Sequence, residues 1–304
     1  MITFFTTAKA FVGHSGMIQR NALKSWKLLH PDVEVIVFGD EDGVADVCAE
    51  TGLRHEPRVE RHESGMKYLD FMFREAQHTA RHDMLCYSNC DIVLGGDFRE
   101  AAERVRNWRE KFLLVARRWD TDVTSPIDFQ RGKWAAELRT LALAEGMKQS
   151  PHYVDFFVFP RGFYDDVPPL VVGRSYWDHW LVWRALHGGL PVVDASRFVV
   201  PIHQNHEYGY HPLGKQGTNE DALAQRNRVL CENGKLQRSI HDATHAMSKN
   251  GTIYPTPLRR IFANLYAMRE KQGFLENTFW LRKKLGLRRS TLLRLSSLRS
   301  TKKR

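Results

Sequence analysis

The stretch Met84-Leu85-Cys86-Tyr87-Ser88-Asn89-Cys90-Asp91 joins a short apolar run to the polar pattern Asn-x-Asp. The apolar residues 84–87 have the length and composition of a buried strand. In open α/β sheets, ligands bind beyond the carboxyl ends of the strands. The stretch therefore predicts a buried strand that ends at a ligand-binding edge.

Short apolar strands alternate with amphipathic helices on both sides of this stretch. The other predicted strands cover residues 2–7, 33–38, 112–116, 155–159 and 191–194. The predicted helices cover residues 17–29, 44–51, 67–80, 98–108, 133–145 and 177–186. This alternation is typical of a mostly parallel sheet flanked by helices, so the predicted fold class is α/β.

The net charge of +10 is concentrated at the carboxyl end of the sequence. Residues 259–304 hold 14 Lys or Arg and 2 Glu, a surplus of +12, which leaves −2 for residues 1–258. Strand signals stop near Leu213, and the remainder reads as helical and increasingly basic. We therefore predict an α/β domain over residues 1–215 and a helical, basic C-terminal extension over residues 216–304.

The lengths of the apolar runs and the spacing of the cysteines indicate a cellular compartment for the protein. No apolar run approaches the roughly 18–20 residues that span a bilayer, and residues 1–5 do not resemble a signal peptide. The four cysteines form no Cys-x-x-Cys pair, and Cys86 and Cys90 would lie about 13 Å apart on a strand, too far to bridge. We expect reduced thiols and a cytoplasmic location.

Asn89 and Asp91 are the first candidate site residues. Side chains two apart in an extended segment point the same way, so both can face one ligand. A carboxylate there suits Mg²⁺ or Mn²⁺, whose other positions water and diphosphate oxygens can fill. Asn and Asp also cap their own backbone in turns, and the pattern alone does not decide between the two roles.

Asp178 is the second candidate, at the start of a predicted helix between Trp177 and Trp180. Apolar neighbours that remove water from a carboxylate raise its basicity, which suits a general base. An Asp in the first turn of a helix is also favoured by capping and by the helix dipole, which explains an isolated Asp without any catalytic role.

Residues 203–211 contain three histidines directly after the apolar run 198–202. Neutral imidazole is a common ligand of divalent ions, so His203 and His206 are candidate metal ligands. The spacing does not match a structural zinc site, because no Cys pair accompanies it.

Polar residues also follow the first two predicted strands. Thr6, Thr7 and Lys9 come at the end of the first strand, and Asp40 follows the second. These residues can contact the base, ribose or phosphate of a nucleotide. Polar residues are common at strand ends in any α/β protein, so each of them alone is a weak signal.

Five segments occur in a fixed order: Thr6-Thr7-Ala8-Lys9, Tyr87-Ser88-Asn89-Cys90-Asp91-Ile92-Val93-Leu94, Asp155-Phe156-Phe157-Val158-Phe159-Pro160-Arg161, Trp177-Asp178-His179-Trp180 and His203-Gln204-Asn205-His206-Glu207-Tyr208. Together they resemble a family of bacterial and plant glycosyltransferase-like proteins with the nucleotide-diphospho-sugar transferase (GT-A) fold. The resemblance covers residues 1–215, and the ordered set is more specific than any single segment. It implies a GT-A type, Rossmann-like sheet that is mostly parallel.

The resemblance implies roles for individual residues. Asp91 stands where the last Asp of the family's D-x-D motif binds a metal, and Asn89 occupies the first Asp position. Asp178 stands where inverting enzymes place the acidic residue that deprotonates the acceptor hydroxyl. His203 or His206 stands where a late-chain histidine often binds the metal.

The implied activity is transfer of a sugar from a nucleotide-diphospho-sugar to a saccharide or lipid-linked acceptor, as in cell-surface polysaccharide synthesis. Mn²⁺ or Mg²⁺ would stabilise the leaving nucleoside diphosphate, while a base activates the hydroxyl. Arg161 can add positive charge near the diphosphate, although it equally suits a surface arginine after a strand.

Two other function classes remain open at this point. A sugar-phosphate nucleotidyltransferase is less favoured, because no Gly-rich phosphate loop follows the first strand. A non-enzymatic protein that binds a polyanion or a membrane through its basic tail is the other class.

The tail itself predicts a membrane contact. Leucines and basic residues are interleaved over residues 281–295, after Phe279 and Trp280, as in an interfacial helix. We expect docking on an anionic membrane surface, at the inner face of the cytoplasmic membrane, and we do not expect nucleic acid as a partner. A solvated, disordered tail is the alternative.

Overall fold

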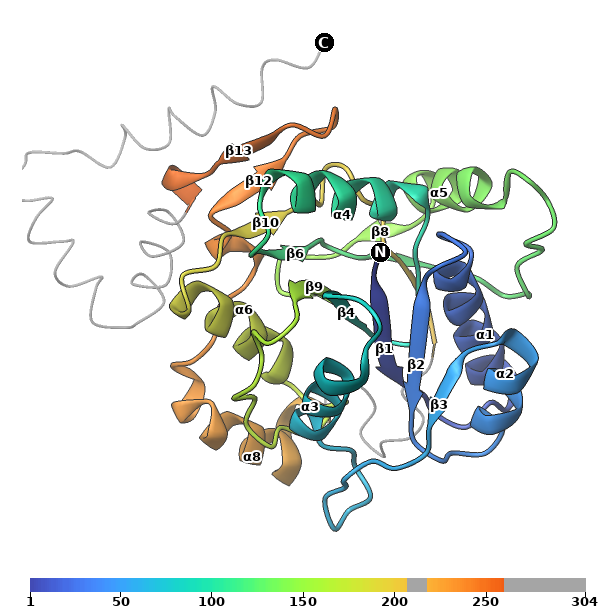
Figure 1. The fold of residues 1–304 in the computed structure, drawn as a ribbon, viewed down its shortest axis with the longest axis horizontal. Helices are drawn as coiled ribbons and strands as arrows, with labels where there is room; N and C mark the ends of the chain where they lie inside the picture. Colours follow the sequence, from blue (N-terminus) through green and yellow to red (C-terminus); the bar gives the residue numbers. More distant parts are fainter. Residues whose placement is uncertain (207–217, 260–304) are drawn as a thin grey trace, which may run out of the picture. The chain divides into compact units, whose positions relative to one another are not determined.

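A computed structural model describes residues 1–206 and 218–259, which form two β-sheets and their surrounding helices (Figure 1). The larger sheet has nine strands in the order β13-β12-β10-β6-β9-β4-β1-β2-β3. These strands are β1 (Thr3–Thr7), β2 (Glu34–Phe38), β3 (Arg54–Glu56), β4 (Met84–Ser88), β6 (Leu113–Val115), β9 (Phe156–Pro160), β10 (Val192–Asp194), β12 (His245–Met247) and β13 (Ile253–Pro255).

Most neighbouring strands in this sheet are parallel. β9 is antiparallel to both β4 and β6, and β13 is antiparallel to β12, whereas the other pairs are parallel. The predicted α/β class with a mostly parallel sheet is confirmed. The reversed direction of β9 matters for the site, because its amino end lies at the same edge as the carboxyl ends of β1, β2 and β4.

Helices cover both faces of the large sheet. The helices of the described residues are α1 (Gly13–Lys27), α2 (Val44–Thr51), α3 (Leu69–Thr79), α4 (Gly96–Trp108), α5 (Trp134–Ala144), α6 (Trp177–His187), α8 (Ala222–Leu230) and the 3₁₀ turns η1 (Glu232–Gly234) and η2 (Ile240–Asp242). All six helices predicted from the sequence are present; α2 has the predicted ends, and the other five differ at one or both ends.

The central strands are buried on both faces, which explains their continuous apolar runs. Phe4 and Phe5, neighbours in β1, are both fully buried but belong to different core clusters. The cluster of Phe4 includes residues of α1, α2 and α4, and the cluster of Phe5 includes residues of α3 and α6. The sheet is thus held rigidly between two apolar layers.

A second, four-stranded sheet begins directly after the Asn-x-Asp pattern. Its order is β5-β11-β7-β8, with β5 (Ile92–Val93), β11 (Ile202–Gln204), β7 (Trp119–Thr121) and β8 (Met147–Lys148). In its register His203 lies opposite Ile92 on one side and opposite Asp120 on the other. This sheet brings together four segments that are distant in the sequence.

The division of the chain differs from the predicted boundary at residue 215. The first compact unit runs from Met1 to Pro257, and a second begins at Leu258. β12 and β13 join the large sheet, but they are three residues each, too short to show strand periodicity. The basic tail over residues 260–304 lies outside the described residues.

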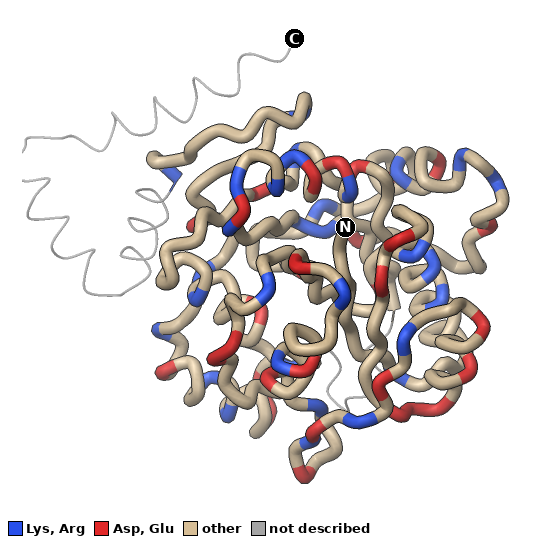
Figure 2. Tube along the Cα trace, viewed as in Figure 1, with Lys and Arg blue, Asp and Glu red and all other residues tan. Residues whose placement is uncertain are grey.

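Within the described residues, no helix has the length and apolar character needed to cross a membrane. All four cysteines are buried free thiols, as expected. Figure 2 shows Lys and Arg interspersed with Asp and Glu along the described trace, in keeping with the near-neutral charge of residues 1–258.

Candidate metal and catalytic site

Asp91 lies at the centre of a candidate metal site beyond the carboxyl end of β4. Its Oδ2 is 3.2 Å from His206 Nε2 and 3.6 Å from His203 Nε2. Its Oδ1 is buried and has no hydrogen-bond partner among the described residues. Burial alone would raise the pKa of this carboxyl, but the two imidazoles hold it well below its ordinary value. Asp91 is therefore an ionised carboxylate with a ligand position available on Oδ1.

The three side chains offer donors suited to a divalent cation. One ligand atom from each of Asp91, His203 and His206 lies within 4.8 Å of the other two. Imidazole suits first-row transition ions, whereas Mg²⁺ prefers oxygen ligands, so the two histidines favour a transition ion over Mg²⁺. The sequence left open whether His203 or His206 joins Asp91, and the structure brings both to it.

The small sheet positions His203. β11 is antiparallel to β5, and the Gln204 backbone N–H donates to Asp91 O at 3.2 Å. The buried Gln204 side chain also donates to Ile18 O (2.8 Å) and accepts from Asn21 Nδ2 (2.9 Å). The backbone that carries the histidine is thereby fixed against both α1 and the Asn-x-Asp loop.

Asp120 orients the ring of His203. Its Oδ1 lies 3.2 Å from His203 Nδ1, while its Oδ2 accepts from Gln149 Nε2 at 2.7 Å. A carboxylate on the far nitrogen of a metal-binding histidine fixes the tautomer and raises the basicity of the ligating nitrogen. Asp120 gives no signal in the sequence, because it lies in a three-residue strand outside every recognised segment.

Arg118 connects Asp120 to Asp155. Its Nε lies 2.8 Å from Asp120 Oδ1, and its Nη1 donates to both oxygens of Asp155 at 3.2 and 3.3 Å. Only about 7% of the Arg118 side chain is exposed, so its charge is little screened. This cation, also missed from the sequence, balances part of the negative charge of the buried carboxylates.

Asn89 faces Asp155 through its amide nitrogen, at the amino end of β9. Its Nδ2 donates to Asp155 Oδ1 at 2.7 Å, and its backbone N–H donates to Asp155 O at 2.9 Å. The amide that replaces the first Asp of the D-x-D pattern is thus fixed by a second carboxylate.

Asp178 lies in the first turn of α6, as predicted. About 23% of its side chain is exposed, and burial raises the pKa of its carboxyl, with a further increase from the charge of Asp155. The flanking Trp177 is buried and packs edge-on against Tyr87, with ring centroids 5.3 Å apart. Asp178 is therefore a carboxylate with raised basicity, electrostatically coupled to the Asn89–Asp155 pair.

The predicted nucleotide-contact residues occupy the carboxyl ends of β1 and β2, with differing exposure. Thr6 is buried, and the Thr7 hydroxyl donates to Phe38 O at 3.0 Å. Burial lowers the pKa of Lys9, and the charge of Asp91 opposes part of that decrease, so Lys9 lies within electrostatic reach of the metal cluster. Asp40 is 70% exposed and pairs with Arg61 at 2.5 Å.

Lys67 holds this edge of the sheet together and was not singled out from the sequence. Its buried ammonium contacts Thr7 Oγ1 and donates to Ala8 O at 2.9 Å, and it pairs with Glu41 at 2.5 Å. The β1–α1 loop is therefore tied to the β2–α2 loop by a buried ion pair.

Arg161 is not part of this site, which corrects the sequence-based expectation. It follows β9, and because β9 is antiparallel its carboxyl end lies at the opposite edge of the sheet. The guanidinium donates to the carbonyls of Gln77 (3.0 Å), Ala80 and His82 (2.9 Å), where it caps the end of α3. Its charge stabilises a helix terminus rather than a diphosphate.

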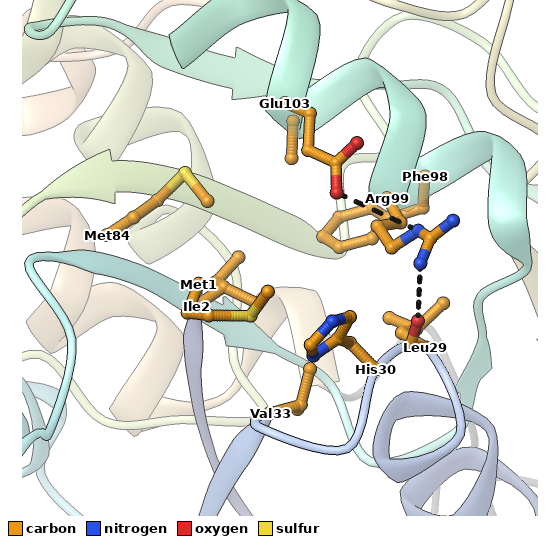
Figure 3. A pocket seen from close by; sticks show the side chains of 10 residues that line it. Met1, Ile2, Leu29, His30, Val33, Met84, Phe98, Arg99 and Glu103 are labelled. Atoms are coloured by element: carbon orange, nitrogen blue, oxygen red, sulfur yellow. Dashed lines mark hydrogen bonds and ion pairs between the residues drawn. The ribbon is translucent and has the colours of Figure 1, made fainter.

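An apolar cavity lies at that opposite edge (Figure 3). It is lined by Ile2, Leu29, Val33, Met84 and Phe98, among others, and Arg99 donates across it to Leu29 O at 3.4 Å. Ile2, Val33 and Met84 precede or begin β1, β2 and β4, whereas Asp91 follows the carboxyl end of β4. The cavity is thus separated from the metal cluster by the length of the sheet.

Comparison of the sequence with protein-family models and with curated proteins finds no match. Solved structures of glycosyltransferases do match in fold. One is glucosyl-3-phosphoglycerate synthase from Mycobacterium tuberculosis in complex with Mg²⁺ and UDP, at 14% identity and TM-score 0.46, covering 84% of this chain and 87% of that chain.

Two further matches are a fragment and a putative enzyme. S. aureus TarS 1-349 in complex with UDP-GlcNAc matches at 11% identity and TM-score 0.45. The match covers 68% of this chain and 59% of that chain. A putative nucleotide-diphospho-sugar transferase from Desulfovibrio desulfuricans G20 matches at 9% identity and TM-score 0.41, covering 77% of this chain and 96% of that one. The chain is similar in fold to these glycosyltransferases. The side chains of this chain carry the functional proposal that follows.

Proposed function

We propose that the protein is a metal-assisted, inverting glycosyltransferase that uses a nucleotide-diphospho-sugar donor. The observation that carries this proposal is the cluster of Asp91, His203 and His206, whose ligand atoms lie within 4.8 Å of one another at the ligand-binding edge of the sheet. The buried Asp91 Oδ1, which has no hydrogen-bond partner among the described residues, fits a bound cation.

Asp91, His203 and His206 would hold the ion, with Asp120 orienting His203. A divalent ion bound there supplies Lewis-acid stabilisation of the diphosphate leaving group. Mn²⁺ suits the two imidazoles better than Mg²⁺ does. Thr6, Thr7, Lys9 and Asp40 lie at the neighbouring strand ends, where the nucleotide part of the donor would bind.

Asp178 is proposed as the general base. Its carboxylate accepts the proton of an acceptor hydroxyl as that oxygen bonds to the anomeric carbon, and the bond from that carbon to the diphosphate oxygen breaks. A single displacement inverts the anomeric configuration and releases a nucleoside diphosphate. The raised pKa of Asp178 suits this role, because a stronger base takes the hydroxyl proton more readily.

The acceptor is proposed to be a saccharide or a lipid-linked glycan, as in cell-surface polysaccharide synthesis. The support is the surplus of +12 over residues 259–304, where basic and apolar residues alternate. Such a tail would bind anionic lipid and place the protein at the inner face of the cytoplasmic membrane, where a lipid-linked acceptor is presented.

A thermal-shift panel of nucleoside diphosphates, with and without Mn²⁺, tests the donor site. A ligand that binds only the folded state raises Tm by mass action. We expect one nucleotide to raise Tm in the presence of Mn²⁺ and to lose that effect in Asp91→Ala, while the exposed Asp165→Ala control keeps it. Equal shifts without metal, or in Asp91→Ala, would count against the proposal.

A further inference from the structure

The ring of His179 lies between two acceptor oxygens, directly after the proposed base. Its Nε2 is 3.1 Å from His152 O, and its Nδ1 is 3.3 Å from Gln237 Oε1. An amide or peptide oxygen cannot donate, so each ring nitrogen must carry a hydrogen to make its bond. An imidazole with hydrogens on both nitrogens is a cation.

The cation would stand beside the carboxylate of Asp178. His179 Nε2 is 3.9 Å from Asp178 Oδ2, and both side chains are about one-fifth exposed. At this distance, in a partly dehydrated site, opposite charges interact more strongly than they would in water. The backbone is also fixed, because Arg238 N–H donates to His179 O at 3.1 Å.

Other titratable groups surround the pair. The segment before β9 contributes His152 and Asp155, the residue after α8 contributes Cys231, and η2 contributes His241 and Asp242. The ring centroid of His152 lies 5.5 Å from that of His179 and 5.9 Å from that of His241. Burial and the charges of His179 and His241 lower the pKa of His152, which keeps that neighbouring ring neutral.

We propose that His179 is held as an imidazolium and acts as a positioning residue that keeps Asp178 ionised and oriented for proton acceptance. The proposal rests on the role of Asp178 in the proposed function. The acceptor oxygens of His152 and Gln237 keep both ring nitrogens of His179 protonated. The resulting positive charge offsets the effect of burial on the Asp178 carboxylate.

The pKa directions agree with this geometry. Burial raises the pKa of Asp178, and the charge of His179 opposes that increase. Burial would lower the pKa of His179, but Asp178 and the two acceptor oxygens outweigh it and raise the pKa above the ordinary value of histidine. Removing the cation would therefore raise the pKa of Asp178 further, and a higher pH would be needed to ionise the base.

A purely structural role makes a different prediction. If His179 only tied α6 to the segment around Gln237, its loss would lower kcat equally at every pH. If it tunes the base, its loss would move the acidic limb of the pH profile, because that limb reports the ionisation of Asp178. The two roles are therefore separable in the same set of variants.

Nuclear magnetic resonance tests the charge without any need for turnover. In the ¹⁵N-labelled full-length protein at pH 7, we expect both ring nitrogens of His179 to show imidazolium shifts, and we expect its titration midpoint to fall in Asp178→Asn. The exposed His187, on the same helix, serves as the internal reference. A neutral tautomer at pH 7, or a midpoint that Asp178→Asn leaves unchanged, overturns the proposal.

The pH dependence of kcat/KM then tests the consequence for the base. We expect His179→Gln to move the acidic limb upward by about one pH unit, the scale of one lost charge at this distance. His179→Arg should restore the limb by restoring a cation, and His187→Gln should leave it unchanged. An unshifted limb in His179→Gln overturns the proposal. Absence of turnover in the wild-type protein with every nucleotide-sugar overturns the proposed function instead, and the resonance experiment still decides whether the two residues are paired.

Discussion

His206 Nε2 lies 3.2 Å from Asp91 Oδ2, although 115 positions separate the two residues in the sequence. The pairing depends on two short strands, β5 and β11, which place the histidine segment beside the Asn-x-Asp loop. The rings of His203 and His206 are 5.4 Å apart between centroids, so both can face the same carboxylate. The cluster therefore exists only in the folded chain, and binding of a cation there would stabilise the fold.

Asp120→Asn should weaken metal binding without removing a ligand. The amide keeps the shape of the side chain but loses the charge that orients His203, and loss of such a partner lowers metal affinity about 10- to 100-fold. Calorimetric titration with Mn²⁺ measures the change. Asp128→Asn, in an exposed turn where Asp128 accepts from Gln130 N–H, is the control and should bind normally. An unchanged Kd in Asp120→Asn contradicts the orienting role.

Asp178→Asn should lower turnover by roughly 10²-fold or more, because general base catalysis contributes about that much. Asparagine retains the size and the capping ability of aspartate at the start of α6, and KM for the donor should change little. Steady-state kinetics with varied donor at saturating acceptor measures both constants. Near-normal kcat would falsify the assignment and leave Asp178 as a first-turn acid favoured by the helix dipole.

The same substitution should stabilise the folded protein at neutral pH. The pKa of Asp178 is raised by burial, so the folded state prefers the protonated carboxyl, and ionisation costs stability as the pH rises through that pKa. Removing the charge should therefore raise Tm at pH 7 by about 2 °C, a gain that disappears below about pH 4. Calorimetry at both pH values decides it, with the exposed Asp165→Asn as the matched control. A lower Tm at pH 7 is the contrary outcome.

Binding to anionic vesicles should depend on the tail. Replacing Arg282, Lys283, Lys284, Arg288 and Arg289 by serine removes five charges, each worth about 1 kcal/mol near an anionic surface. Co-sedimentation at physiological salt should show binding by the wild-type protein and its loss in this variant. The control replaces five exposed basic residues of the first unit, Arg106, Lys111, Lys133, Lys235 and Lys249. Equal partitioning of wild type and tail variant rules out docking through these charges.

Much of the fold and the centre of the site could be predicted from the sequence. Short apolar runs such as that of β4 and longer helical periods such as that of α3 have lengths that distinguish strands from helices. Asp91, His203 and His206 were identifiable because they follow apolar runs, and strand ends in an α/β sheet converge on one edge.

The rest of the site depends on strand pairings that produce no pattern in the local sequence. β7 and β8 have three and two residues, too few for a period, so the Asp120 and Arg118 that they position gave no signal. Periodicity also does not report strand direction. Because β9 is antiparallel to β4, Asp155, which precedes β9, lies at the site, whereas Arg161, which follows β9, lies at the opposite edge of the sheet.

Product analysis tests the central proposal most directly. The wild-type protein is incubated with a panel of nucleotide-sugars and saccharide or lipid-linked acceptors, with and without Mn²⁺, and the released nucleotide is identified by mass spectrometry. We predict a nucleoside diphosphate and a product of inverted anomeric configuration, formed only with metal, lost in Asp91→Ala and retained in Asp165→Ala. Release of pyrophosphate, or metal-independent release that Asp91→Ala leaves unchanged, would contradict a glycosyl transfer centred on Asp91, His203 and His206.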